Sequence, residues 1–179
     1  MLRDWSGVRA DELFPDLLVP VCAPSVVGDL PPLGPEQLLR LPLIHTSTRP
    51  DAWTDWFAAQ NIELQEPPPY ALEFGHFFMS LDAAQKGHGV ALVPTVALIN
   101  HPGFDQLVDP TDRRKTEYVH SNGAYYMLFH EVRGELERVK AFREWLLEEA
   151  ACLREKCRPE NLMRRTLSRD CRPADAAAQ

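Results

Sequence analysis

The sequence is poor in three features that mark large classes of protein: paired cysteines, long apolar runs and an excess of positive charge. Its four cysteines form no CxxC pair, so neither a zinc site nor a disulfide framework is predicted. The longest apolar stretches, such as Val90–Pro94, are far below the roughly 20 residues that span a bilayer. A formal charge of -7 disfavours a surface that neutralises nucleic-acid phosphates. With no signal-peptide layout at the start, we expect a cytoplasmic protein with no membrane partner.

The common motifs of enzymes and metal proteins are missing as well. The chain has no GxSxG, HExxH, P-loop or strand-linked GxGxxG pattern. No two of its six histidines are spaced i, i+4, so a metal site has no local support. Cys22 is a conceivable nucleophile, although a small buried hydrophobic role suits its apolar surroundings better. We therefore expect no enzyme, no metal and no cofactor, and keep a small hydrolase as the weakest alternative.

Short apolar runs alternate with segments of helical period along most of the chain, which is typical of an α/β fold. In the segment Asp51–Ala59, three aromatic residues share one helix face, and this stripe is predicted to be core. Extended segments are predicted at Val8–Phe14, Leu17–Ala23, Leu43–His45, Tyr70–Phe74, Val90–Pro94, Glu117–His120 and Ala124–Phe129. Helices are predicted at Asp51–Ala59, Phe77–Lys86, Thr95–Ile99 and Leu136–Ala151.

Charge is distributed unevenly. Residues 152–179 carry seven basic and four acidic side chains, whereas the preceding residues carry 12 basic and 22 acidic ones. Hydrophobic periodicity is also lost after about residue 157. We predict a solvated, disordered basic tail over residues 152–179, and consider a nucleic-acid-binding arm the weaker interpretation.

Four segments together resemble the effector-binding domain of LysR-type transcriptional regulators. These are Glu12–Pro24, then Leu43–Phe57 with its Trp-x-x-Trp-Phe pattern, then Phe74–Pro94 with its Gly-x-Gly and strand, and finally Tyr125–Leu146. The second segment is similar to the subgroup that contains the glycine-cleavage activator and the β-lactamase regulator. The resemblance extends over roughly residues 5 to 150. It implies a type 2 periplasmic-binding-protein fold, with two α/β lobes and a small-molecule cleft between them.

The resemblance also divides the chain. Residues 1–23 correspond to a remnant of the first lobe and a crossing strand, and residues 24–120 to a complete second lobe. Residues 121–151 correspond to the returning strand and last helix of the first lobe, which is therefore partial. The family's helix-turn-helix has no counterpart after Met1, so we expect a truncated regulator that cannot read an operator by itself. Apolar surface of the first-lobe elements is expected to be exposed.

In such a fold, ligands lie beyond the carboxyl ends of the strands, beside the helices that follow. Thr46, Ser47 and Thr48 occupy one such junction, where hydroxyls and helix N–H groups suit a carboxylate or phosphate. The alternative is that one of these hydroxyls only caps the helix. His76 and Phe77 occupy a second junction, where His76 either donates to an anion or is an ordinary surface residue. Thr95 and Tyr125 are the remaining candidates for effector contact.

The function that the resemblance implies is small-molecule effector sensing within a transcription regulator. Its partners would be a small effector, for which an anion is one candidate, and a homo-oligomer or a hetero-oligomer with a full-length regulator. DNA would be bound only through a domain absent from this chain. The alternative is an interaction fragment that forms mixed oligomers with a full-length regulator. Neither the effector nor the target genes follow from the residues.

Overall fold

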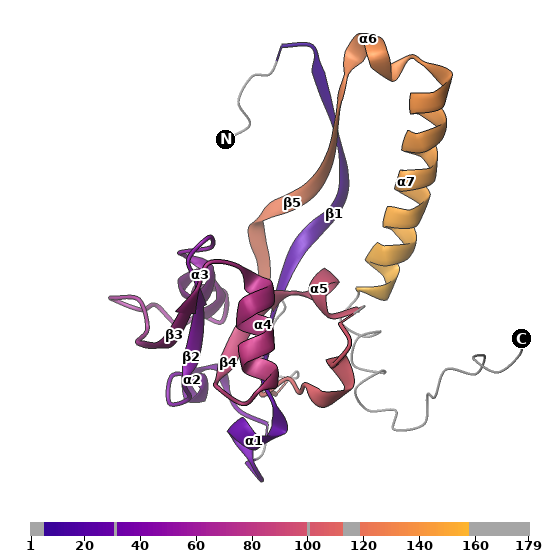
Figure 1. Ribbon diagram of the computed structural model, residues 1–179. Coiled ribbons are helices and arrows are strands. Elements are labelled where there is room, and N and C mark those ends of the chain that lie inside the picture. Colours follow the sequence, from indigo (N-terminus) through magenta and orange to yellow (C-terminus); the bar gives the residue numbers. More distant parts are fainter. Residues whose placement is uncertain (1–5, 31, 100, 113–118, 158–179) are drawn as a thin grey trace, which may run out of the picture.

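The computed structural model describes residues 6–30, 32–99, 101–112 and 119–157, and shows an α/β body from which a long two-stranded ribbon projects (Figure 1). The elements follow in the order β1 (Val8–Val21), α1 (Pro24–Val27), α2 (Pro35–Leu38), β2 (Leu43–Thr46), α3 (Ala52–Ala59), β3 (Tyr70–Phe74), α4 (Phe77–Gln85), β4 (Val90–Pro94), α5 (Thr95–Ile99), the 3-10 helix η1 (Phe104–Gln106), β5 (Val119–His130), α6 (Glu131–Gly134) and α7 (Glu137–Lys156).

One mixed sheet organises the body, with the strand order β3-β2-β4-β1-β5. Strand β2 pairs in parallel with β3 and β4, whereas β1 runs antiparallel to both β4 and β5. The carboxyl ends of β2, β3 and β4 therefore meet at a single edge of the sheet, which is where the candidate ligand residues were predicted to converge.

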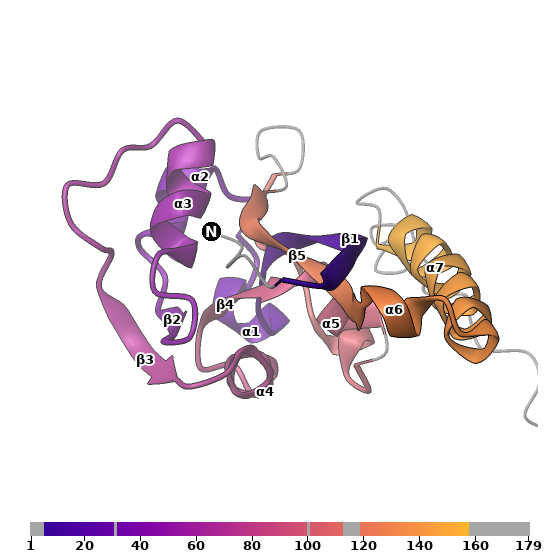
Figure 2. The ribbon, with the colours of Figure 1, turned by 90° about the horizontal axis from the view of Figure 1, so that it is seen from above.

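The two faces of the sheet are buried against different helices, because side chains alternate along each strand. Leu18, Val90 and Leu92 pack on one face with the aromatic residues of α3, and Trp53, Trp56 and Phe57 are buried there as predicted. Val19, Ala91 and Val93 point to the other face, where α4 and α5 supply the remaining core, such as Leu81 and Leu98. Figure 2 shows α3 and α4 in separate positions around these strands. Both faces of the sheet are thus covered within the body.

Strands β1 and β5 are longer than the sequence predicted. The segments Val8–Phe14 and Leu17–Ala23, predicted separately, are joined in one 14-residue strand that ends at Val21. The interruption survives only as register shifts between Glu12 and Phe14 and between Pro15 and Leu17. Likewise, β5 continues through Ser121–Gly123, which was predicted to be a connection. Pairing between distant strands keeps both segments extended, and a local pattern does not report such pairing.

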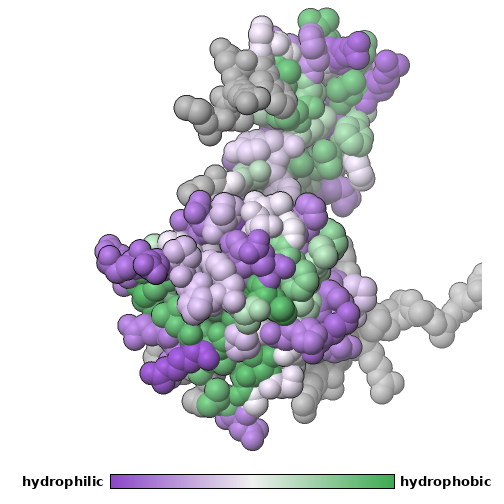
Figure 3. Space-filling view, turned by 60° about the vertical axis from the view of Figure 1, so that its left-hand side comes forward, coloured by the Kyte–Doolittle hydropathy of each residue, from purple (hydrophilic) through white to green (hydrophobic). Residues whose placement is uncertain are grey.

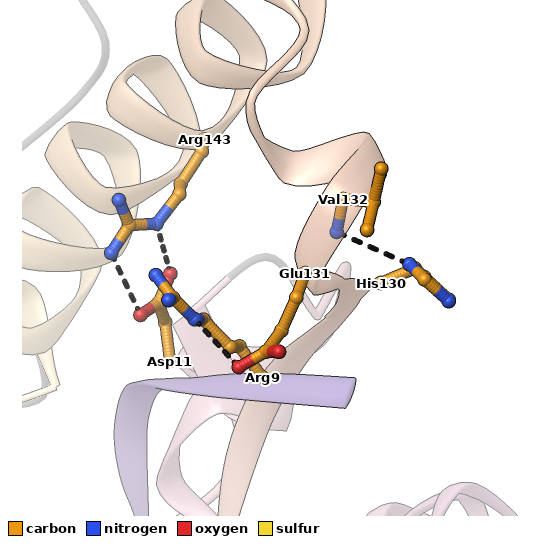
Figure 4. A network of polar contacts seen from close by, with 6 residues as sticks. All are labelled: Arg9, Asp11, His130, Glu131, Val132 and Arg143. Atoms are coloured by element: carbon orange, nitrogen blue, oxygen red, sulfur yellow. Dashed lines mark hydrogen bonds and ion pairs between the residues drawn. The ribbon is translucent and has the colours of Figure 1, made fainter. Parts of the chain in front are cut away.

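The outer half of the ribbon is covered on one face by α7 (Figure 1). Figure 4 shows how the helix is attached: the Arg143 guanidinium binds both carboxylate oxygens of Asp11 on β1, with Nη2 2.9 Å from Oδ1. Arg9 and Glu131 form a second ion pair, 3.2 Å long, that links β1 to the start of α6. Two ion pairs therefore connect α6 and α7 to strand β1 of the ribbon.

Helix α7 ends at Lys156, five residues later than predicted, so residues 152–156 belong to the helix and not to a tail. Arg154 and Lys156 in its last turn favour this extension, because cations interact well with the C-terminal end of a helix. The rest of the predicted tail, residues 158–179, lies outside the described residues. No helix in the described ranges is long and apolar enough to cross a membrane.

Large apolar side chains are exposed on the ribbon and on the helices that follow it. They include Tyr126, Leu128, Val132, Leu136, Phe142 and Trp145, and we call this set the ribbon face. Figure 3 shows hydrophobic residues reaching the surface in the upper part of the molecule, where the ribbon lies. The sequence analysis expected exposed apolar surface on these elements, and the side chains are exposed.

Candidate functional site

The ends of β2 and β3 are fastened to each other at the predicted site. The Ser47 N–H donates to the Phe74 carbonyl at 2.9 Å, and the Ser47 hydroxyl lies 3.3 Å from the same oxygen. The backbone N–H of Arg49 donates to the Thr46 carbonyl at 2.8 Å, which closes the loop before α3. The two strand-to-helix junctions thus form one continuous surface.

Of the three hydroxyl residues in this loop, two reach solvent. Ser47 and Thr48 are exposed, whereas Thr46 is buried and its Oγ1 lies 2.8 Å from the Ser80 hydroxyl on α4. Thr46 therefore holds the end of β2 against α4. The capping alternative does not apply to these residues, because the N-cap of α3 is Asp51 and no side chain caps that helix.

His76 and Phe77 lie at the second junction, at the start of α4. His76 is the N-cap residue in extended conformation, makes no side-chain cap and is exposed. Its ring stacks on Phe78, with ring centroids 5.5 Å apart and an interplanar angle of 11°. Phe77 is half-buried and meets Phe78 edge-on. The imidazole is thus presented to solvent beside an apolar side chain.

Thr95 follows β4 at the same edge, but its side chain is buried. It lies close to the Cys157 thiol, which comes from the end of α7. Burial raises the pKa of Cys157, and the contact with Thr95 acts in the opposite direction. Thr95 therefore lies beneath this part of the edge instead of on it.

Tyr125 lies on β5 close to the point where the ribbon enters the body. The centroid of its ring is 4.7 Å from the ring centroid of Phe14. Tyr125 is half-buried, whereas Tyr126 is exposed. Burial raises the pKa of Tyr125, and the nearby Asp16 carboxylate raises it further. Alternation along β5 thus separates the two tyrosines and places Tyr125 near the loop that follows β2.

Three polar residues near Tyr125 escaped the sequence analysis. Asp16 is buried in β1, and its Oδ2 accepts hydrogen bonds from Arg49 and, at 2.8 Å, from the Ser121 hydroxyl. The only signal for Asp16 is a charged residue inside the apolar run from Leu13 to Cys22. Arg49 and Ser121 carry no such signal, since each lies in a polar segment.

The assembled edge presents hydrogen-bond donors on a partly apolar surface. Hydroxyls of Ser47 and Thr48, the imidazole of His76 and the guanidinium of Arg49 suit recognition of an acidic group. Within the described ranges, no cluster of three or more His, Cys, Asp or Glu residues could hold a metal ion. Burial raises the pKa of Cys22 to about 12, which leaves little thiolate for nucleophilic attack. The arrangement is therefore suited to binding.

Comparison with known proteins identifies the family of the chain. The family model of the LysR substrate binding domain matches residues 2–151. The glycine cleavage system transcriptional activator of Escherichia coli (strain K12) is 34% identical over 158 residues, which cover 87% of this chain and 49% of that protein. The HTH-type transcriptional activator AmpR of Pseudomonas aeruginosa is 35% identical over 147 residues, or 82% of this chain and 47% of that protein. The chain thus spans about half the length of these relatives.

Solved structures give the same result for the fold. The effector domain of AmpR from Pseudomonas aeruginosa superposes with a TM-score of 0.65 at 32% identity, covering 84% of this chain and 68% of that one. The AmpR effector binding domain from Citrobacter freundii gives a TM-score of 0.65 at 24% identity, covering 83% and 70%. The fold is therefore the periplasmic-binding-protein-like α/β fold that the sequence predicted, in a family of transcription-regulator domains and not of enzymes. The chain belongs to the LysR substrate-binding domain family.

Proposed function

We propose that this chain senses a small-molecule effector for a LysR-type transcription regulator, and that the effector contacts the edge formed by the ends of β2, β3 and β4. The observation that carries the proposal is the convergence of exposed hydrogen-bond donors at that edge. Ser47, Thr48 and His76 come from two junctions that a direct Ser47–Phe74 hydrogen bond joins. Ligand sites of open α/β sheets lie at such edges.

The chemistry of the edge favours an anionic effector. Ser47, Thr48 and His76 would make direct contacts, and Phe77 and Tyr125 would provide apolar walls beside them. Thr46 and Thr95 would support the edge without contacting the effector, since both side chains are buried. This division of roles follows from exposure alone.

The regulatory role would reside in a larger assembly. In a two-lobed binder, an effector that prefers the closed arrangement shifts the population toward it, and the oligomer transmits the change. The setting would be the cytoplasm, and the chain would act in a homo-oligomer. DNA binding would require the helix-turn-helix of a LysR-type regulator.

The proposal is tested by screening pools of carboxylated and phosphorylated metabolites against the isotope-labelled chain by NMR. We expect a ligand whose titration shifts the amides of Ser47, Thr48 and His76, and whose affinity falls at least about tenfold in the double variant Ser47→Ala/Thr48→Ala. Ser25→Ala is the matched control, because this exposed hydroxyl follows β1, which ends at the opposite edge of the sheet. Ligands that shift only residues away from this edge would refute the site.

A second candidate function is that of an interaction fragment. The ribbon face favours this function. Phe142 and Trp145 on α7 are both more than half exposed, and their ring centroids are 5.6 Å apart. Such a surface is unusual on a monomeric soluble domain. A full-length regulator of the same family is the partner that this face would suit, through a mixed oligomer.

A further inference from the structure

A buried polar cluster joins both crossing strands to the loop of the candidate effector edge. Asp16 lies on β1, Ser121 on β5 and Arg49 in the loop before α3. The carboxylate is almost completely buried, with 5% of its side chain exposed, whereas a quarter of the Arg49 side chain reaches solvent. The cluster thus has a buried end at the strands and an accessible end at the edge.

The hydrogen bonds of the cluster leave an acceptor oxygen of Asp16 and donor N–H groups of Arg49 available. Oδ2 of Asp16 accepts from Arg49 Nη1 and from the Ser121 hydroxyl. Oδ1 of Asp16 is buried and has no hydrogen-bond partner among the described residues. The ion pair uses only Nη1 of Arg49, so other N–H groups of the guanidinium remain for Tyr125, beside it, and for a ligand.

A guanidinium anchored in this way suits the recognition of an acidic group. Its planar fork matches a carboxylate or a phosphate, and an ion pair that fixes one nitrogen limits the freedom that the side chain would lose on binding. Arg49 follows directly after Ser47 and Thr48, whose hydroxyls are exposed at the same place. Three donor residues are therefore contiguous, and one of them is positively charged.

We propose that Arg49 is the anion-binding residue of the effector edge, and that Asp16 is a positioning residue that holds its guanidinium. The acceptable effector then carries a carboxylate or phosphate group. Binding at Arg49 is communicated to the crossing strands, because Asp16 and Ser121 belong to them. This inference rests on the proposed effector site and adds to it the charged residue that selects an anionic effector.

Inorganic phosphate is a suitable probe, titrated into the isotope-labelled chain at constant ionic strength and followed by NMR. We expect saturable shifts at Ser47, Thr48 and the Arg49 side-chain Nε–H. The dissociation constant should rise at least about tenfold in Arg49→Gln, corresponding to the loss of a charge-assisted contact. Asp16→Asn should weaken binding about threefold and move the Arg49 Nε–H signal before phosphate is added.

A double-mutant cycle separates positioning from a structural effect. If Asp16 acts through Arg49, Asp16→Asn should have no further effect on phosphate affinity once Arg49 is glutamine. Arg9→Gln is the matched control, because Arg9 also pairs with one carboxylate but lies on the outer ribbon. The control should bind phosphate as the unmodified chain does. If Arg9→Gln weakened phosphate binding as much as Arg49→Gln does, the proposal would be overturned.

The remaining outcomes separate this inference from the proposed function. Shifts at Ser47, Thr48 and His76 that persist at the same phosphate concentration in Arg49→Gln would overturn the role of Arg49 and leave the effector edge in place. No shift at the edge in the unmodified chain would count against both proposals.

Discussion

Cys22 illustrates how the environment of a residue decides its chemistry. The side chain is fully buried beside the hydrophobic core, and burial raises the pKa of its thiol to about 12. At pH 8 only about one thiol in ten thousand would be ionised, and the thiolate is the reactive form. Cys152 on α7 is exposed. We predict that iodoacetamide alkylates Cys152 much faster than Cys22 in the folded chain, as mass spectrometry of the separated peptides would show.

The control is the same reaction in denaturant, where both thiols should react at similar rates. Rapid alkylation of native Cys22 would contradict its burial and would revive the nucleophile that the sequence analysis set aside.

Single residues also show what the sequence could and could not predict about the site. Burial of Trp53, Trp56 and Phe57 was predictable, because their spacing places them on one helix face. The loop that holds Ser47 and Thr48 was predictable as well, since it follows a short apolar strand. The Asp16–Arg49–Ser121 cluster was not, because its members are separated by up to 105 positions and meet only through strand pairing.

At the scale of elements, helix α7 depends on a polar attachment as much as on apolar contacts. The hydrogen bond from Arg143 lowers the pKa of Asp11 below its ordinary value of 3.8. A lowered pKa in the folded state means that the pair stabilises docking above the unfolded pKa, and that this contribution is lost as the pH falls through the folded pKa. We predict that hydrogen exchange in α7 accelerates relative to α3 and α4 as the pH drops from 5 to about 3.

Asp11→Asn is the variant that tests the cause. It should loosen α7 already at neutral pH and flatten the acid dependence, with the second lobe unchanged. An acid response of α7 that is identical in Asp11→Asn would assign the effect to other carboxylates.

The elements themselves differ in how far local sequence determines them. Strands β3 and β4 were predicted with the bounds observed, since each is a short run between clear breaks. Strands β1 and β5 were predicted as fragments, because Pro15 and Ser121–Gly123 resemble turns locally. Their mutual pairing over Val8–Leu18 keeps the backbone extended through both interruptions.

At the scale of the molecule, the described residues form one covered lobe and one partly covered ribbon. Solved effector domains of the family are longer, since the chain covers 68% of the AmpR effector domain from Pseudomonas aeruginosa. Burying exposed apolar surface is favourable by about 25 cal/mol per Å². The exposed side chains of the ribbon face therefore favour association.

We predict that this tendency produces mixed oligomers with a full-length regulator of the family, as the proposed interaction-fragment function requires. The chain would be mixed with full-length AmpR of Pseudomonas aeruginosa and followed by sedimentation velocity, with a fluorescent label on the chain. We expect the label to move with the regulator, and the double variant Phe142→Glu/Trp145→Glu to reduce the bound fraction at least about fivefold, since two charges would enter an apolar contact.

Leu30→Glu is the matched control, because Leu30 is 56% exposed but lies after α1, on the body. It should leave the bound fraction unchanged if the ribbon face is responsible. Sedimentation of the label at the monomer position, with or without the regulator, would refute the interaction-fragment function. Effector binding at the edge of β2, β3 and β4 would survive that result, because the edge lies in the body, whereas the proposed homo-oligomer would not.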